Sequence, residues 1–203
     1  MRLKYGKHPH HLLHTEENNI CLKMKEVEVK VLSIDPDAVE KKLLELGAEK
    51  TFSELMTVRY FDKKNGDIRK KGDLLRVRKF GDERTEVCYK TNKRVENGFK
   101  VCDEYNLSGE SFAEAVKLFE NLGYKVTCAY EKKRTTFLLN DLEIVIDQYP
   151  QIPPFVEIEG TDTESIEQLI KDLNLSGNER SSRAIGGLLQ EKYPKIKLNG
   201  LTF

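Results

Sequence analysis

The 203-residue sequence lacks a surplus of charge of either sign, because 34 Lys and Arg residues balance 34 Asp and Glu residues. This balance argues against a chain that mainly coats nucleic acid or an acidic membrane. The sequence also lacks an apolar run near the roughly 18 residues that a membrane-spanning helix needs, and its first residues lack the apolar stretch of a secretory signal. We therefore predict a cytoplasmic protein with neither a membrane nor a nucleic-acid partner.

Cysteine is also scarce, and the four cysteines show no CxxC spacing. A zinc knuckle or a redox motif is therefore not expected, and free thiols are the simplest prediction. The cysteines are Cys21, Cys88, Cys102 and Cys128.

Histidine occurs only within the first fourteen residues, at irregular spacing. Such a cluster can bind a transition metal, but an appended arm is the simpler interpretation. Met24 then opens the strand-like run that contains EVEVKV, and this run looks like a natural beginning. We expect an N-terminal extension over residues 1–23, one domain over residues 24–193 and a C-terminal tail over residues 194–203. A domain of this size can bury a core without disulfides.

The hydrophobic periodicity changes along the chain between two residues, typical of strands, and about 3.6 residues, typical of helices. Eight segments follow the strand pattern: Val27–Leu32, Thr51–Asp62, Leu74–Phe80, Thr85–Thr91, Phe99–Leu107, Thr127–Asn140, Leu142–Tyr149 and Pro154–Glu159. Four segments follow the helical pattern, between capping residues and helix-ending residues: Asp35–Leu46, Ser111–Leu122, Thr163–Leu173 and Ser181–Tyr193. These segments predict an α+β fold with more strands than helices.

Charged residues of both signs recur on one face of nearly every predicted strand. In EVEVKV, Glu26, Glu28 and Lys30 share one face, while the three valines share the other. An ordinary sheet would turn its charged face to solvent, and this interpretation remains an alternative. Against it, the amphipathic helices need an apolar surface to cover, and eight strands are enough to close a barrel. If helices cover the apolar outer face, the charged face lines a wet tunnel.

The residue types predict what such a tunnel would bind, because unpaired buried charges are costly. Carboxylates at alternate positions offer the hard oxygen ligands that suit Mg²⁺ or Mn²⁺. Arginine and lysine supply charge-assisted donors for phosphate oxygens. A polyphosphate with a bound divalent cation would satisfy both sets of side chains.

At these positions the sequence resembles the CYTH superfamily of triphosphate tunnel metalloenzymes, and it looks most like the class IV adenylyl cyclase branch. The resemblance extends from Met24 to about Leu189. The motifs that carry it are ExExK with Glu26, Glu28 and Lys30, LRVRK with Arg76 and Arg78, YKT with Lys90, KKRTTF with Lys132 and Arg134, IDQY with Asp147, and FVEIEG with Glu157 and Glu159. The resemblance implies a closed eight-stranded antiparallel β-barrel, the triphosphate tunnel, with amphipathic helices packed on the outside.

The resemblance also implies roles for these side chains. Glu28 and Lys30 would be catalytic, and either Lys30 or a metal-bound hydroxide would take the proton of the nucleophile, since a lysine among other cations can have a lowered pKa. One or two divalent cations, Mg²⁺ or Mn²⁺, would be held by Glu26, Glu28, Asp147, Glu157 and Glu159. ATP or another triphosphate would be bound by Lys30, Arg76, Arg78, Lys90, Lys132 and Arg134.

Two segments depart from the pattern of the family. Cys102 stands between Lys100 and Glu104, where relatives commonly have a basic residue followed by two inward acids. Near the end the chain reads SSRAIGGLL, where relatives often show Ser-Tyr-x-x-Leu-Leu, so closure of the tunnel by the last helix stays open. Arg183 in that segment would either contact phosphate or lie in solvent.

Several functions fit these features. The leading hypothesis is a metal-dependent enzyme on triphosphates, most like a class IV adenylyl cyclase that converts ATP to cyclic AMP and pyrophosphate. The alternatives are an inorganic triphosphatase or thiamine triphosphatase, a noncatalytic polyphosphate-binding or nucleotide-binding module, and a structural domain with a solvated charged sheet. The resemblance also makes a homodimer a candidate oligomeric state.

Overall fold

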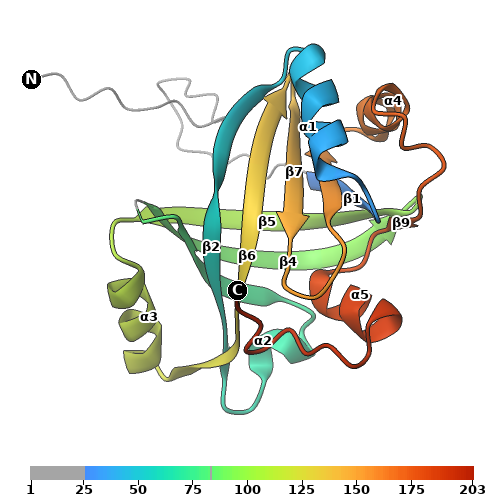
Figure 1. The fold of residues 1–203 in the computed structure, drawn as a ribbon. Coiled ribbons are helices and arrows are strands. Elements are labelled where there is room, and N and C mark those ends of the chain that lie inside the picture. Colours follow the sequence, from blue (N-terminus) through green and yellow to red (C-terminus); the bar gives the residue numbers. More distant parts are fainter. Residues whose placement is uncertain (1–25, 83) are drawn as a thin grey trace, which may run out of the picture.

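The computed structural model describes residues 26–82 and 84–203. The predictions for residues 1–23, including the histidine cluster and Cys21, lie outside this part of the chain. The described chain forms a closed barrel of eight antiparallel strands with helices on its outside (Figure 1). The fold predicted from the alternating charge pattern is therefore confirmed.

The barrel closes because its first strand pairs on both edges. Strand β1 pairs with β8 on one edge and with β5 on the other, where Glu26, Val27 and Glu28 face Cys102, Val101 and Lys100. A two-residue strand, β9, occupies the remainder of that second edge. The strands are β1 (Glu26–Val31), β2 (Glu49–Lys63), β3 (Leu74–Phe80), β4 (Arg84–Glu96), β5 (Phe99–Gly109), β6 (Tyr124–Leu139), β7 (Leu142–Gln148), β8 (Phe155–Gly160) and β9 (Arg180–Ser181).

Five helices connect or follow these strands: α1 (Pro36–Glu45), α2 (Asp67–Lys70), α3 (Phe112–Asn121), α4 (Thr163–Asp172) and α5 (Ile185–Lys192). Side chains of Asp35, Ser111 and Asp162 accept backbone N–H groups at the starts of α1, α3 and α4, as the capping signals predicted. The one-turn helix α2 was not predicted from the sequence pattern. It forms where the carboxylate of Asp62 accepts the N–H groups of Ile68 and Arg69.

The largest apolar cluster lies outside the barrel wall, between strands and helices. The valines of β1, Val27, Val29 and Val31, are buried in one cluster with residues of α1 and α4. Helix α4 contributes Ile166 and Ile170, each fully buried. Burying one such side chain stabilises the fold by about 1.5–3 kcal/mol. This packing occupies the outer faces of the strands, so their charged faces are left to line the interior.

The last residues of the chain, predicted as a tail, pack against strand β6 of the barrel. Leu201 is buried and bridges Tyr130 of β6, and the Glu131 N–H donates to the Leu201 carbonyl at 2.8 Å. Helix α5 buries Ile185, Leu188 and Leu189 in the same cluster. The glycine pair inside SSRAIGGLL therefore does not prevent the helix from forming and packing.

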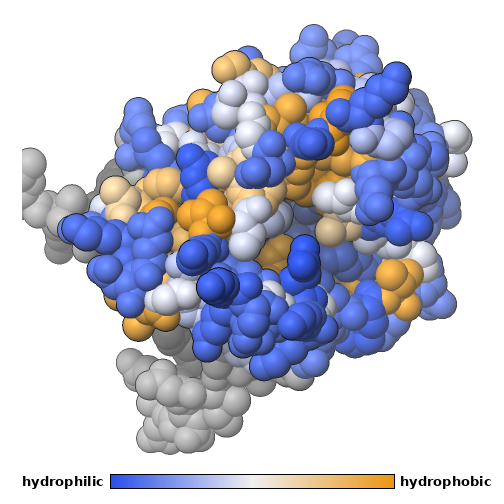
Figure 2. All heavy atoms as spheres, turned by 90° about the horizontal axis from the view of Figure 1, so that it is seen from below, coloured by the Kyte–Doolittle hydropathy of each residue, from blue (hydrophilic) through white to orange (hydrophobic). Residues whose placement is uncertain are grey.

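The face of the molecule seen from below is mainly polar (Figure 2). Figure 2 views the molecule from below and shows hydrophilic residues over most of that face, with hydrophobic residues in smaller separate patches. Within residues 26–82 and 84–203, every helix is too short or too polar to cross a membrane.

Candidate functional site

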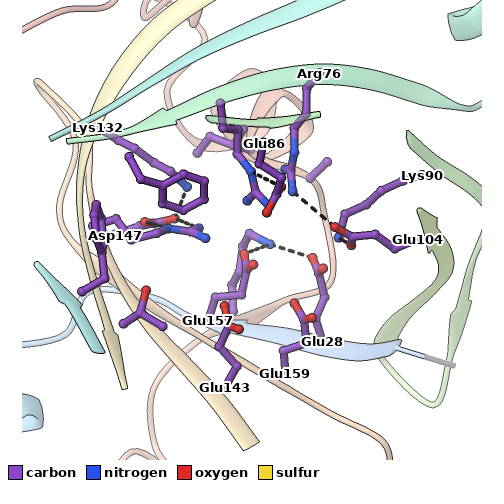
Figure 3. A pocket seen from close by; sticks show the side chains of 18 of the residues that line it. Glu28, Arg76, Glu86, Lys90, Glu104, Lys132, Glu143, Asp147, Glu157 and Glu159 are labelled. Carbon is purple, nitrogen blue, oxygen red and sulfur yellow. Dashed lines mark hydrogen bonds and ion pairs between the residues drawn. The ribbon is translucent and has the colours of Figure 1, made fainter. Parts of the chain in front are cut away.

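A cavity of about 530 Å³ occupies the interior of the barrel. All eight barrel strands contribute side chains to its lining, and these include ten Lys or Arg residues and eight Asp or Glu residues. Figure 3 shows charged groups pointing inward from several sides of the barrel. The charged strand faces therefore converge around one cavity instead of facing bulk water.

Three carboxylates meet on the β1 and β8 wall. Strand register places Glu28 opposite Glu159 and Lys30 opposite Glu157. One carboxylate oxygen from each of Glu28, Glu157 and Glu159 lies within 4.8 Å of the other two. Three hard oxygen donors at this spacing suit Mg²⁺ or Mn²⁺. We refer to these three residues as the acidic triad.

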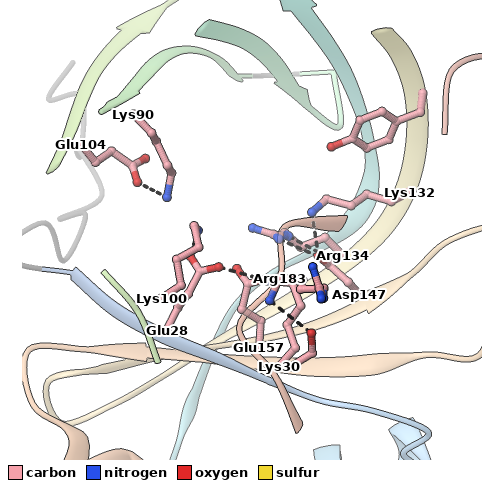
Figure 4. Close-up of polar contacts among 12 residues, drawn as sticks. Glu28, Lys30, Lys90, Lys100, Glu104, Lys132, Arg134, Asp147, Glu157 and Arg183 are labelled. Atoms are coloured by element: carbon pink, nitrogen blue, oxygen red, sulfur yellow. Dashed lines mark hydrogen bonds and ion pairs between the residues drawn. The ribbon is translucent and has the colours of Figure 1, made fainter. Parts of the chain in front are cut away.

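Two lysines contact the acidic triad (Figure 4). Lys30 Nζ lies 2.5 Å from Glu157 Oε2 and 3.0 Å from Glu28 Oε1, and Lys100 Nζ lies 2.6 Å from Glu28 Oε2. Burial favours the protonated carboxyl of Glu157, but Lys30 and Arg134 hold its pKa well below the ordinary value. The nearby basic groups also lower the pKa of Glu28, so Glu157 and Glu28 are both ionised at neutral pH.

The two predicted acids outside the triad differ in position. Glu26 lies in β1, with its backbone opposite Cys102. Asp147 is buried in β7, where its carboxylate accepts hydrogen bonds from Arg134 Nε at 2.8 Å and from Lys132 Nζ at 2.7 Å. Burial opposes the charge on Asp147, but Arg134 and Lys132 lower its pKa. This geometry favours Asp147 as a counter-ion that orients two basic side chains.

The pKa values of Lys30 and Lys132 are shifted in opposite directions. Burial disfavours the charge on Lys30, but Glu157 and Glu28 raise its pKa above the ordinary value, so it stays protonated. Burial and the neighbouring Arg134 lower the pKa of Lys132 to about 7, with Asp147 acting in the opposite direction. Of these two lysines, only Lys132 can exchange a proton near neutral pH.

The β3, β4 and β5 wall carries the other predicted phosphate-binding residues. Arg78 Nε donates to Glu86 Oε1 at 2.9 Å, and Lys90 pairs with Glu104. Arg76 Nη2 lies 3.7 Å from the same Glu104 carboxylate. The structure thus brings Arg76, Arg78 and Lys90 into the cavity and pairs each one with an acid.

A second cluster with metal-ligand spacing lies on this wall and contains Glu86, Cys88 and Glu104. Cys88 Sγ donates to Glu104 Oε1 at 3.1 Å, and burial raises the pKa of the Cys88 thiol to about 11. This cluster offers two carboxylates and a protonated thiol, whereas the acidic triad offers three carboxylates, the ligands that Mg²⁺ and Mn²⁺ prefer. The acidic triad is therefore the better candidate metal site.

The site also contains residues that were not among the ligands predicted from the sequence. The alternation of side chains along each strand indicates that these residues point inward. Glu86 shares a strand face with Lys90, and Glu143 shares one with Asp147, so both point inward. Lys100 and Glu104 occupy the basic and acidic positions on either side of Cys102, which is itself buried.

Uncharged groups form part of the cavity wall. The hydroxyl groups of Tyr60 and Tyr130 lie 3.1 Å apart, and the ring of Tyr149 lies 5.6 Å from that of Tyr130. Ile185 at the start of α5 lines the cavity beside them. Arg183, just before this helix, pairs with Glu191 and is 61% exposed. The last helix thus contributes an apolar wall, and Arg183 lies largely in solvent.

Comparison with known proteins agrees with this architecture. The CYTH domain model matches residues 24–184, and the chain belongs to this family. A protein of Methanocaldococcus jannaschii named "putative adenylate cyclase" is 27% identical over 162 residues, which make up 75% of this chain and 91% of that protein.

Solved structures show the same fold. A "putative adenylate cyclase" from Vibrio parahaemolyticus matches with a TM-score of 0.69 at 20% identity, over 83% of this chain and 99% of that chain. A "putative adenylyl cyclase" from Hippeastrum, described as having a dominant triphosphatase activity, matches with a TM-score of 0.61 at 14% identity, over 82% of this chain and 95% of that chain. At these identities the likeness concerns the fold.

Proposed function

We propose that this protein is a divalent-metal-dependent enzyme that acts on triphosphate substrates inside the barrel. The observation that carries the proposal is the cavity inside the barrel, with basic residues on opposite walls and the acidic triad between them. Its lining has two more basic than acidic residues, and one divalent cation would raise this positive excess. The site would then be strongly complementary to a highly charged polyphosphate anion.

The residues of the chain would bind and orient this anion. Arg76 and Arg78 on one wall, and Arg134 on another, are fixed guanidinium donors suited to phosphate oxygens. The acidic triad would hold Mg²⁺ or Mn²⁺. When bound, this ion would neutralise phosphate charge and polarise the reacting phosphorus–oxygen bonds. The carboxylates that now pair with the basic groups keep them in place before the ligand arrives.

Cyclisation of ATP is the reaction we favour. The ribose 3′-hydroxyl oxygen attacks the α phosphorus, the bond to the β-phosphate oxygen breaks, and pyrophosphate leaves with the electron pair. Basic side chains around the leaving group stabilise the charge that develops on it. Tyr60, Tyr130 and Tyr149 offer a surface for the nucleoside. The name of the Methanocaldococcus jannaschii relative supports this choice.

Lys132 is the better proton acceptor for this step. Its pKa of about 7 lets it accept the hydroxyl proton at neutral pH, whereas Glu157 and Glu28 keep Lys30 protonated. We therefore assign Lys30 to phosphate binding and to positioning the acidic triad. Glu28 retains its proposed role as a metal-binding carboxylate.

Hydrolysis of the terminal phosphate is the second candidate. The Hippeastrum protein, which shares the fold, is described as having a dominant triphosphatase activity. In this reaction water attacks the terminal phosphorus, so the same basic side chains and the same acidic triad would serve. A noncatalytic polyphosphate-binding or nucleotide-binding module would keep binding but show no turnover.

Product analysis tests these candidates. The protein is incubated with Mg²⁺ or Mn²⁺ and with ATP, tripolyphosphate or thiamine triphosphate, and cyclic AMP, pyrophosphate, nucleoside diphosphate and phosphate are separated. Cyclic AMP from ATP is the expected product, and phosphate release from any substrate would indicate the triphosphatase. Glu159→Gln should abolish turnover, while Glu110→Gln, at an exposed position, should not. If the protein binds a triphosphate but forms no product, it is a noncatalytic binding module. If it binds no triphosphate, the proposal is refuted.

A further inference from the structure

Strand β4 contains a bulge that reverses the direction of one basic side chain. The pairing of β4 with β5 shifts register between Thr91 and Arg94, and Asn92 has a left-handed backbone with φ of +51°. Lys90 lines the cavity, so regular alternation would turn residue 92 inward and Lys93 outward. Instead Lys93 lines the cavity. Bulges commonly re-aim side chains next to functional sites.

Specific side-chain contacts hold this bulge. Asn92 Nδ2 donates to Asp103 Oδ2 at 2.5 Å, across to β5. Thr91, at the start of the bulge, donates through its hydroxyl group to Asp73 Oδ1 at 2.7 Å. Asparagine also tolerates the left-handed conformation better than most residues. The inward position of Lys93 is therefore built into the local sequence.

Lys93 differs from the other basic residues of the cavity in its contacts. Each of the others has an interaction partner, whereas no hydrogen bond or ion pair engages Lys93 among residues 26–82 and 84–203. The hydroxyl groups of Tyr89 and Thr91 already occupy both oxygens of the nearby Asp73. Burial and the neighbouring Lys100 lower the pKa of Lys93. The Lys93 ammonium thus faces the cavity outside any ion pair of the described residues, and Asp73 only partly offsets the effect of Lys100 on its pKa.

The charges around Lys93 indicate which ligand it fits. Lys90 and Lys100 line the same part of the cavity, and Lys100 pairs with Glu28 of the acidic triad. Lys93 lies three residues further along β4 than Lys90, so the two lysines face different stretches of a linear ligand. Three lysines in one region, one of them outside any ion pair, are suited to a phosphate group at the end of a chain.

We propose that Lys93 binds the end phosphate of the polyphosphate chain and makes the site select three phosphates over two. This inference rests on the proposed triphosphate function and adds a specificity-determining residue to it. The bulge at Asn92 is the structural feature that turns Lys93 toward the cavity.

Calorimetric titration with tripolyphosphate and pyrophosphate, in the presence of Mg²⁺, tests the proposal. Lys93→Met should weaken tripolyphosphate binding by about tenfold or more, since a hydrogen bond to a charged group is lost, and should weaken pyrophosphate binding much less. Lys93→Arg should restore most of the affinity for tripolyphosphate. Arg94→Met is the matched control, because Arg94 is exposed and pairs with Glu96 outside the cavity. Its affinities should match those of the unmodified protein.

The possible failures are distinguishable. If the unmodified protein binds tripolyphosphate but Lys93→Met behaves like Arg94→Met, the role of Lys93 is refuted and the proposed function stands. Equal losses for both ligands would refute the selection of chain length. If the unmodified protein binds no tripolyphosphate, both proposals are refuted. Thermal melting checks folding, and Lys93→Met should melt no lower than the unmodified protein, because it removes repulsion from Lys90 and Lys100.

Discussion

Replacing Asp147 by asparagine would test the role of the buried ion pairs. Asp147 is 1% exposed, and its carboxylate contacts Arg134 through both Nε, at 2.8 Å, and Nη2, at 2.7 Å. The Lys132 ammonium lies 2.7 Å from the same carboxylate. Asp147→Asn keeps the size of the side chain but removes the only negative charge that these two groups contact among the described residues.

The expected loss of stability is large. Removing one partner of a buried ion pair costs about 3–5 kcal/mol, because the other charge is left uncompensated. Arg134 cannot lose its proton, whereas Lys132, with a pKa of about 7, can. The cost should therefore be higher at pH 6 than at pH 9. For a chain of this length, about 3–5 kcal/mol corresponds to a melting temperature lower by roughly 6–20 °C.

Thermal melting at both pH values, with and without tripolyphosphate, is the assay. The anion should stabilise Asp147→Asn more than the unmodified protein, because it supplies the missing negative charge. Glu159→Gln, a substitution in the acidic triad, is the matched comparison. It should weaken metal binding more than Asp147→Asn does, and it should lower the melting temperature less. A melting temperature of Asp147→Asn within about 2 °C of the unmodified protein would refute the reasoning. A metal affinity lowered as much as in Glu159→Gln would restore Asp147 as a metal ligand.

Three further predictions concern the metal site, a pH effect and the C-terminal segment. Glu159→Gln should raise the Mn²⁺ concentration for half-maximal binding at least about tenfold, measured by titration; an unchanged value would exclude the acidic triad as the metal site. Lys132 is protonated below its pKa of about 7, so tripolyphosphate affinity should fall from pH 6 to pH 9. Lys132→Met should flatten this fall, and an equally steep profile would contradict the assignment. Leu201→Ala should lower the free energy of unfolding in urea by about 2 kcal/mol, because Leu201 is buried against Tyr130; a loss below about 0.5 kcal/mol would mean that residues 194–203 are a loose tail.

Local patterns in the sequence predicted most of the elements, because their causes are local. Asp35, Ser111 and Asp162 begin helices where their side chains accept backbone N–H groups. Strict alternation in EVEVKV predicted that Glu28 and Lys30 share one face, and both line the cavity. The sequence pattern did not predict helix α2. The N–H groups of Ile68 and Arg69 in its first turn donate to the carboxylate of Asp62, which lies six and seven residues earlier in the chain.

Partner choice within the site depends on the register in which the strands pair. Asp147 has the chemistry of a metal ligand, but the register of β6 and β7 places it opposite Arg134, so it pairs with a guanidinium. Closure of β1 against β8 sets Lys30, a predicted proton acceptor, beside Glu157, which favours the protonated form of the lysine. A shift of either register by one residue would turn these side chains to the other face.

The sequence by itself determined which residues are charged, which strand faces carry them and where the helices begin. Only the tertiary structure decided which charges meet, which stay unpaired and which pKa values shift, because these depend on contacts between different strands, such as that of Lys30 with Glu157. Lys93 illustrates the difference, since alternation along β4 would place it outside the barrel and the bulge at Asn92 places it inside. Burial in the barrel then strengthens each of these contacts, since water screens them less than at the surface.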